Sequence, residues 1–186
     1  MSMVVIGTVF VDVKGFPTDV YVPGGRNAGR IEEVHGGVSR NVAENIAKCG
    51  FNPTFLSLVD GSGAAKAVMS RLDEVGVDTK YIKTTSDGMG TWLAIFDHTG
   101  EVVASLSKRP DFLPLAEVIR SQGDEIFKDC DSILLEIDID EAVVAEVNSL
   151  KQIRRAGIDR KSARSVGKEV VCRIWAENRK HRRSAS

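Results

Sequence analysis

The stretch that decides the fold of this chain runs from Gly36 to Ala47 and reads Gly-Gly-Val-Ser-Arg-Asn-Val-Ala-Glu-Asn-Ile-Ala. Two adjacent glycines let backbone amides approach a ligand closely, because glycine has no Cβ and adopts positive φ readily. A helix is predicted to follow, with a buried side made of Val38, Val42, Ala43, Ile46, Ala47 and Cys49. Its N-terminus offers unpaired N–H groups and a positive dipole end, beside Asn41 and Asn45. The pattern fits a helix N-terminus that binds the oxygens of a ligand. It fits equally well a tight turn that precedes a core helix.

The same stretch resembles the first signature of the ribokinase-type (PfkB) carbohydrate kinase family. In that signature a Gly-Gly pair and a following Asn embrace the hydroxyls of a sugar. The spelling with Arg40, and with Asn45 after Glu44, is most similar to the nucleoside-kinase branch, pseudouridine kinase in particular. The resemblance implies a three-layer α/β/α fold with a doubly wound, mostly parallel sheet and a small β-sheet lid. It also implies that ATP phosphorylates a primary hydroxyl with the help of Mg²⁺.

Size and composition agree with one ordinary globular domain. The chain has 186 residues, 42% of them hydrophobic, and no apolar run long enough to span a bilayer. The first residues lack the basic flank and cleavage site of a signal peptide. Its three cysteines are far apart, and Cys49 is predicted to be buried, so we expect a reduced, cytoplasmic protein.

Charge divides the chain at residue 150. Residues 1–150 carry 13 Lys and Arg against 23 Asp and Glu, a net charge of −10, whereas residues 151–186 carry 12 against 3, a net charge of +9. So abrupt a change predicts a boundary. The basic tail at 151–186 has three interpretations: a shifted reading frame, which is favoured; an engineered or naturally shortened terminus that forms an amphipathic helix on the exposed sheet edge; or a surface that binds nucleic acid or another anionic surface. The last is the weakest, because Trp175 is the only aromatic residue available for stacking.

Before that boundary, short buried strands alternate with amphipathic helices. Strands are predicted at 4–7, 54–59 and 132–137. Helices are predicted after the turn at 60–63, closing at Gly76 (with Ala64, Ala67, Val68 and Leu72 inward), from about Leu115 to Lys128, and from Glu141 to Leu150. This alternation indicates a doubly wound parallel sheet. Asp60 and Ala65 stand where the family usually has glycine.

Further strands are predicted near 8–13, 31–35 and 91–107, the last a hairpin around Asp97-His98-Thr99-Gly100. Both faces of this hairpin carry apolar side chains, including Trp92 and Phe96, so it needs a partner on each side. The resemblance implies that these strands form a lid over the sugar and often a dimer interface. The glycine-rich segment 23–29 between them is predicted to be a loop bordering the substrate, and His35 a structural histidine.

Two carboxylates complete the predicted site. Asp12 follows the first strand, at the sheet edge where open α/β folds bind ligands. It resembles the family aspartate that receives two sugar hydroxyls, although a solvent-facing edge charge explains its position equally well. Glu136 ends the third buried strand and resembles a family carboxylate near the sugar, whereas Asp140 is better explained as a helix N-cap. The predicted substrate-binding set is therefore Asp12, Gly36, Gly37, Asn41 and Glu136.

The sequence lacks the Asp-Thr-x-Gly-Ala-Gly-Asp stretch whose glycines form the anion hole of the family and whose last Asp is the base. The resemblance therefore covers residues 3–150 and implies a substrate-binding portion with negligible turnover and no bound ATP or Mg²⁺. A non-catalytic dimer assembled through the hairpin is the alternative. A Rossmann-type dinucleotide site is disfavoured because no G-x-G-x-x-G follows the first strand, and the scattered His and Cys match no metal-ligand spacing.

Overall fold

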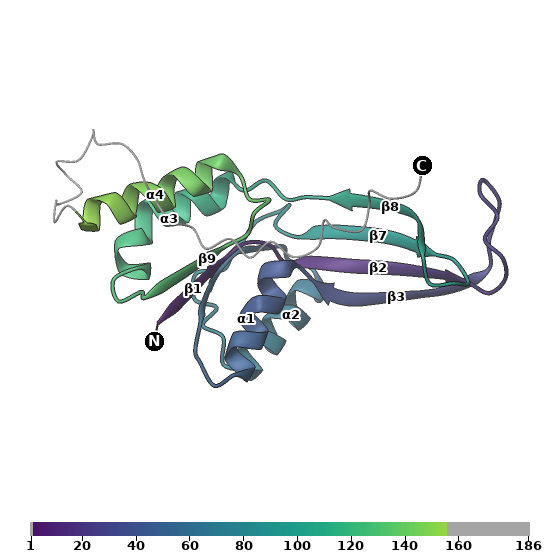
Figure 1. The fold of residues 1–186 in the computed structure, drawn as a ribbon, viewed down its shortest axis with the longest axis horizontal. Coiled ribbons are helices and arrows are strands. Elements are labelled where there is room, and N and C mark those ends of the chain that lie inside the picture. Colours follow the sequence, from purple (N-terminus) through teal and green to yellow (C-terminus); the bar gives the residue numbers. More distant parts are fainter. Residues whose placement is uncertain (1, 156–186) are drawn as a thin grey trace, which may run out of the picture.

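A computed structural model describes residues 2–155 of the chain. Its body is a parallel sheet of β1 (Met3–Ile6), β4 (Thr54–Leu56) and β9 (Ser132–Leu135) in the order β4-β1-β9. Helices α1 (Val38–Lys48) and α2 (Gly63–Glu74) lie on one side of this sheet, and α3 (Leu113–Ile126) and α4 (Glu141–Arg155) lie on the other (Figure 1). The predicted three-layer α/β/α arrangement with a parallel sheet is confirmed.

Strand β1 shows why the sheet is covered on both faces. Successive side chains of a strand point to opposite sides. Val5 packs into the hydrophobic cluster beside α1 and α2, whereas Val4 and Ile6 pack into the cluster beside α3 and α4. All three are at most 1% exposed. An uninterrupted apolar run is therefore what a central strand of this kind requires.

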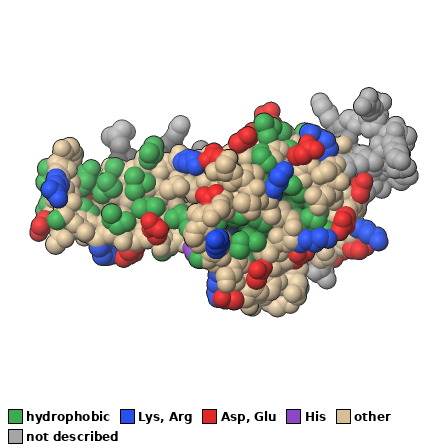
Figure 2. Space-filling model, turned by 180° about the vertical axis from the view of Figure 1, so that it is seen from behind, with side chains coloured by type: hydrophobic (Ala, Val, Ile, Leu, Met, Phe, Trp, Pro, Cys, Tyr) green, Lys and Arg blue, Asp and Glu red, His purple; other side chains and the backbone are tan. Residues whose placement is uncertain are grey.

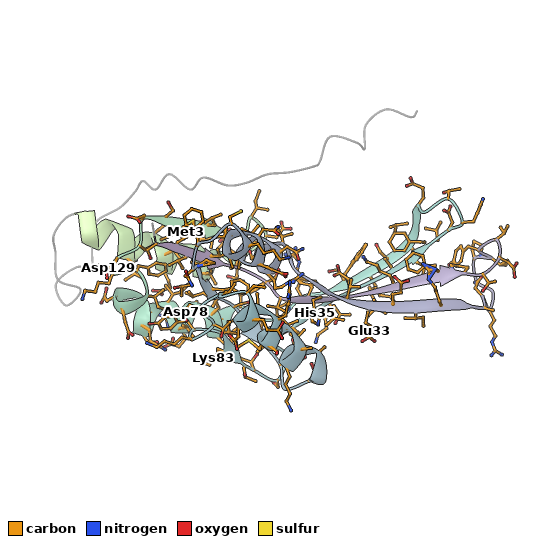
Figure 3. All side chains as sticks on the ribbon, turned by 90° about the horizontal axis from the view of Figure 1, so that it is seen from below. Met3, Glu33, His35, Asp78, Lys83 and Asp129 are labelled. Atoms are coloured by element: carbon orange, nitrogen blue, oxygen red, sulfur yellow. The ribbon has the colours of Figure 1, made fainter. Side chains whose placement is uncertain are left out.

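A second sheet leaves the body as an arm, which we call the lid. It contains β2 (Phe10–Pro17), β3 (Gly29–Gly36), β7 (Gly90–Phe96) and β8 (Val102–Lys108) in the order β3-β2-β7-β8. Strands β2 and β7 pair in parallel, and the other two pairings are antiparallel. Figure 3 shows His35 at the root of this arm and Glu33 farther out along it. The predicted hairpin of β7 and β8 is confirmed, with Asp97 accepting hydrogen bonds from the amides of Thr99 and Glu101 in its turn.

Several predicted boundaries were wrong by a few residues. The strand expected at 54–59 is broken at Ser57, because its second part, β5 (Leu58–Val59), pairs instead with β6 (Lys83–Thr84). Helix α3 begins at Leu113 and α4 continues to Arg155. Capping predictions did better: Asp140 accepts a hydrogen bond from the amide of Ala142 at the start of α4, and Gly50 follows α1 with φ +88°.

The predicted buried sides of two helices need correction. In α1, Val38 is 60% exposed and Cys49 is also exposed, whereas Ser39, Arg40 and Glu44 are buried with Ala43 and Ala47. Small side chains bring α1 close to the sheet, and Val42 and Ile46 are only partly buried. The redox argument from a buried Cys49 loses its basis. In α2, Ala67 is exposed and Ala65 takes its place inside.

Within residues 2–155, no helix combines the length and the apolar character needed to cross a membrane. The basic tail was predicted over residues 151–186. Residues 151–155 lie within α4, so this helix continues past the predicted boundary at residue 150, and residues 156–186 lie outside the described part of the chain.

Candidate functional site

The two glycines before α1 lie where neighbouring atoms approach the backbone closely. A Cβ on Gly37 would lie 2.4 Å from the carbonyl oxygen of Thr8, and its φ of +97° favours glycine. A Cβ on Gly36 would lie 2.3 Å from Oδ1 of Asp12. Close approach therefore brings the β1–β2 junction and the start of α1 together. Gly37 is the N-cap of α1 and gives no side-chain hydrogen bond to its first turn.

Asp12 lies in the lid strand β2, opposite Val34 of β3 and Trp92 of β7. Its carboxylate leans over Gly36, as the short Cβ distance shows. Partial burial raises the pKa of Asp12, and the positive charges of Lys14 and Arg40 lower it in part. The carboxylate thus stands at the root of the lid, within the electrostatic reach of the first turns of α1.

Asn41 and Arg40 complete this group from α1. The guanidinium of Arg40 donates to the side-chain oxygen of Asn41 and, over 2.8 Å, to the backbone carbonyl of His35. Arg40 is 7% exposed, whereas Asn41 is exposed. The structure therefore gathers Asp12, Gly36, Gly37 and Asn41 around the start of α1.

Glu136 occupies a different place from the other four. It follows β9, and its Oε2 accepts hydrogen bonds from the amide of Thr8 at 2.8 Å and from the hydroxyl of Ser39 at 2.8 Å. The hydroxyl of Thr8 donates to both carboxylate oxygens at 2.9 Å. Glu136 therefore ties the β1–β2 junction, α1 and the end of β9 to one another beneath the glycines.

The aromatic side chains of the lid share the face of Asp12. Residues paired across neighbouring strands point to the same face, and Asp12 pairs with Trp92, two positions from Ala94 and four from Phe96. The ring of Phe96 stacks on Phe16 with centroids 5.0 Å apart and meets Trp92 edge-on at 6.4 Å. The ring of Trp92 therefore lies level with Asp12, and those of Phe16 and Phe96 lie farther out along the lid.

The opposite face of the lid is open and apolar. Ile31, Leu93 and Leu106 share it by register and are 74%, 41% and 70% exposed. Figure 2 shows hydrophobic side chains gathered along the arm. Exposed apolar residues in such number are unusual on a surface that meets only water.

The first amides at the start of α2 are already paired with side chains. The glycine-flanked helix start at Gly61-Ser62-Gly63 is closed by its own side chains, since Ser62 Oγ accepts from the amide of Ala65 at 3.1 Å. Oδ1 of Asp60 accepts from the amide of Ser62 at 2.9 Å, which places a negative charge beside it. Within residues 2–155, no three His, Cys, Asp or Glu side chains gather so as to hold a metal ion.

Sequence reasoning missed the polar residues buried under this site. Thr8, Ser39, Arg40, Glu44 and Ser57 are all less than 9% exposed. A charged pair at i and i+4, Arg40 and Glu44, is normally a solvated helix face. The apolar pattern around them was the only signal in the sequence that this pair is buried, because Arg40 and Glu44 occupy two positions on the buried side of α1.

Known proteins resemble most of this chain. A family model described as pfkB family carbohydrate kinase matches residues 1–113. The guanosine-inosine kinase of Exiguobacterium acetylicum is 34% identical over 144 residues, 77% of this chain and 48% of the relative. The pseudouridine kinase of Escherichia coli K12 is 24% identical over 144 residues, 77% of this chain and 46% of the relative.

A solved structure supports the same fold. The ribokinase of Arabidopsis thaliana, solved with ribose and ATP, superposes with a TM-score of 0.64 at 17% identity, over 84% of this chain and 51% of that one. The chain thus spans about half the length of the curated relatives that it matches.

Proposed function

This chain belongs to the pfkB family of carbohydrate kinases, and we propose that it carries the substrate-binding part of an ATP-dependent sugar or nucleoside kinase. The observation that supports the proposal is the gathering of Asp12, the two glycines and Asn41 around the start of α1. A carboxylate accepts hydrogen bonds from hydroxyls, and an exposed amide donates to them. Helix N–H groups attract the oxygens of the same ligand.

A nucleoside is the substrate class that we favour. The resemblance of 36–47 to the nucleoside-kinase branch supports it, as do the two relatives, whose names specify guanosine, inosine and pseudouridine. Trp92 supports it on chemical grounds, because an aromatic ring on the face of Asp12 can stack on a base or on the apolar side of a sugar ring. Glu136 holds the scaffold of the site in this proposal.

Phosphoryl transfer also needs a nucleotide cradle and a base. The sequence holds no Asp-Thr-x-Gly-Ala-Gly-Asp stretch, so we expect the 186-residue chain to bind substrate and to turn over negligibly. ATP and Mg²⁺ belong to the proposed reaction of the family, and no step through them is assigned to the residues of this chain.

Calorimetric titration of the 186-residue chain with inosine, guanosine, pseudouridine, ribose and fructose tests the proposal. We expect Asp12→Asn to weaken binding by about 10- to 100-fold, because a hydrogen bond to a charged group is lost. Asp19→Asn, at an exposed loop position beyond β2, is the matched control and should bind as the wild type does. Absence of binding to all five compounds would contradict the proposal, and robust ATP consumption would contradict the predicted lack of turnover.

A second candidate function is a non-catalytic dimer formed through the lid. The open apolar face of Ile31, Leu93 and Leu106 favours it. Light scattering tests it: loss of a dimer on Leu106→Asp supports assembly through that face, and loss on Phe96→Asp alone indicates the aromatic face. A monomeric wild type would exclude both arrangements.

A further inference from the structure

Arg40 is a buried cation whose contacts converge on the candidate site. Its guanidinium donates to Oε2 of Glu44 at 2.5 Å, to the carbonyl oxygen of His35 at 2.8 Å and to the side-chain oxygen of Asn41. The side chain is 7% exposed, and its Nε has no hydrogen-bond partner within the described residues. Burying an arginine in this way costs free energy of desolvation. Removing its charge partner would cost still more, because the buried charge would be left uncompensated.

The chemistry of the contact determines which way Asn41 faces. A guanidinium carries only donors, so the group of Asn41 that meets it must be the amide oxygen. The amide nitrogen of Asn41 is then turned away from Arg40, and the residue is exposed. An asparagine side chain can present either its oxygen or its NH₂ group to a ligand. By binding the oxygen, Arg40 leaves the NH₂ group of Asn41 facing away as a donor.

Glu44 holds the guanidinium of Arg40 through a hydrogen bond to its Oε2. Its other carboxylate oxygen, Oε1, accepts from Arg71 at 2.9 Å and from Lys48 at 2.8 Å. Hydrogen bonding by Lys48 and then by Arg71 holds the pKa of Glu44 below its usual range, against the effect of burial. Glu44 therefore stays charged, and Arg40 is fixed at one end by Glu44 and at the other by the backbone of His35.

We propose that Arg40 is a positioning residue of the substrate site, which orients the amide of Asn41 as a hydrogen-bond donor. This inference rests on the proposed function. A site built in this way offers one anionic acceptor and one directed donor, which suits a ligand with neighbouring hydroxyls, such as the ribose of a nucleoside. Arg40 acts on such a ligand through Asn41.

The first test needs no ligand. Arg40→Lys keeps the charge and the fold but, as a compact ammonium on a flexible stem, cannot reproduce the rigid fork that reaches three acceptors. The side-chain amide resonances of Asn41, identified in a ¹⁵N spectrum by their loss in Asn41→Ala, should shift strongly toward exposed-asparagine values in Arg40→Lys. Unchanged Asn41 resonances in a folded Arg40→Lys variant would overturn the inference.

The second test is a double-mutant cycle on inosine and ribose binding by the 186-residue chain. Asn41→Ala and Arg40→Lys should each weaken binding about tenfold, as loss of one hydrogen bond does, and the double variant should also be about tenfold weaker. A double variant about 100-fold weaker would show that Arg40 acts independently of Asn41 and would overturn the proposal.

Arg120→Lys is the matched control, because Arg120 pairs with Glu117 of α3 and Glu146 of α4. The affinity of this variant for inosine and ribose should stay within about twofold of wild type. The failures are distinguishable. A wild type that binds neither ligand contradicts the proposed function, while the Asn41 resonances still decide the role of Arg40.

Discussion

The body and the lid of this chain use similar apolar residues but bury them very differently. Every residue of β1 from Val4 to Ile6 is at most 1% exposed, because helices cover both faces of its sheet. All seven residues of β8 are exposed, although Val102, Val103 and Leu106 are as apolar as those of β1. The body is a closed hydrophobic unit, whereas the lid is paired along its strands and left open on its faces (Figure 1). Stability is therefore concentrated in the body, whereas the proposed substrate site lies at the root of the lid.

The largest predicted effect compares two leucines with the same change. Leu56→Ala in β4 should lower the free energy of unfolding by about 2–5 kcal/mol, because Leu56 is 0% exposed and its removal leaves a cavity. Leu106→Ala in β8, 70% exposed, should change it by less than about 0.5 kcal/mol. Urea denaturation at several protein concentrations measures both. A large, concentration-dependent cost at Leu106 would break the comparison, since it would show that this face is covered by another copy.

The next effect concerns the junction where the lid leaves the body. Gly37→Ala should destabilise the protein by about 1–3 kcal/mol, because a Cβ there meets the Thr8 carbonyl as well as an unfavourable positive φ. Gly50→Ala is the control, since its φ is +88° but its Cβ would meet nothing within 4 Å, so that only the backbone strain of about 1 kcal/mol remains. Equal losses would show that the junction is not tightly packed.

The smallest effect is a pH dependence with opposite signs at the two ends of the lid. The pKa of Asp12 is raised above 3.8 by burial, so its charged form opposes folding at neutral pH. Asp12→Asn should therefore stabilise the protein slightly at pH 7, by less than about 1 kcal/mol given solvent screening. That gain should fade as the pH falls through the raised pKa toward 3.8.

Asp97 at the hairpin tip supplies the contrast. Hydrogen bonding by Thr99 lowers the pKa of Asp97, so its charged form favours folding above the unfolded pKa of 3.8 and this stability is lost as the pH falls through the lowered value. Asp97→Asn should accordingly destabilise the protein at pH 7. Thermal unfolding of both variants between pH 3 and pH 7 checks the signs, and the same sign at both positions would contradict the assigned environments.

The sequence was most informative where one local rule dominated. The Asp97-His98-Thr99-Gly100 turn, the Asp140 cap and the apolar run of β1 follow from turn chemistry, capping and strand periodicity. It was least informative on α1. There the apolar stripe predicted Val38 and Cys49 inside, whereas Ser39, Arg40 and Glu44 are buried. Their polar groups have partners, because Ser39 donates to Glu136, Arg40 donates to the backbone carbonyl of His35, and Glu44 accepts from Arg71 of α2.

By itself, then, the sequence determined the alternation of strands and helices, the lid hairpin, the glycine pair and the family. These depend on periodicity and on residue types that few structures tolerate, so they are readable along the chain. Only the tertiary structure decided that Asp12 leans over Gly36, that Glu136 binds Thr8 and Ser39, and that Arg40 donates to the side-chain oxygen of Asn41. These contacts bring together polar and charged groups that the sequence alone does not place side by side. A charged side chain can hold a neighbour in place only when folding removes the water that would otherwise solvate the charge.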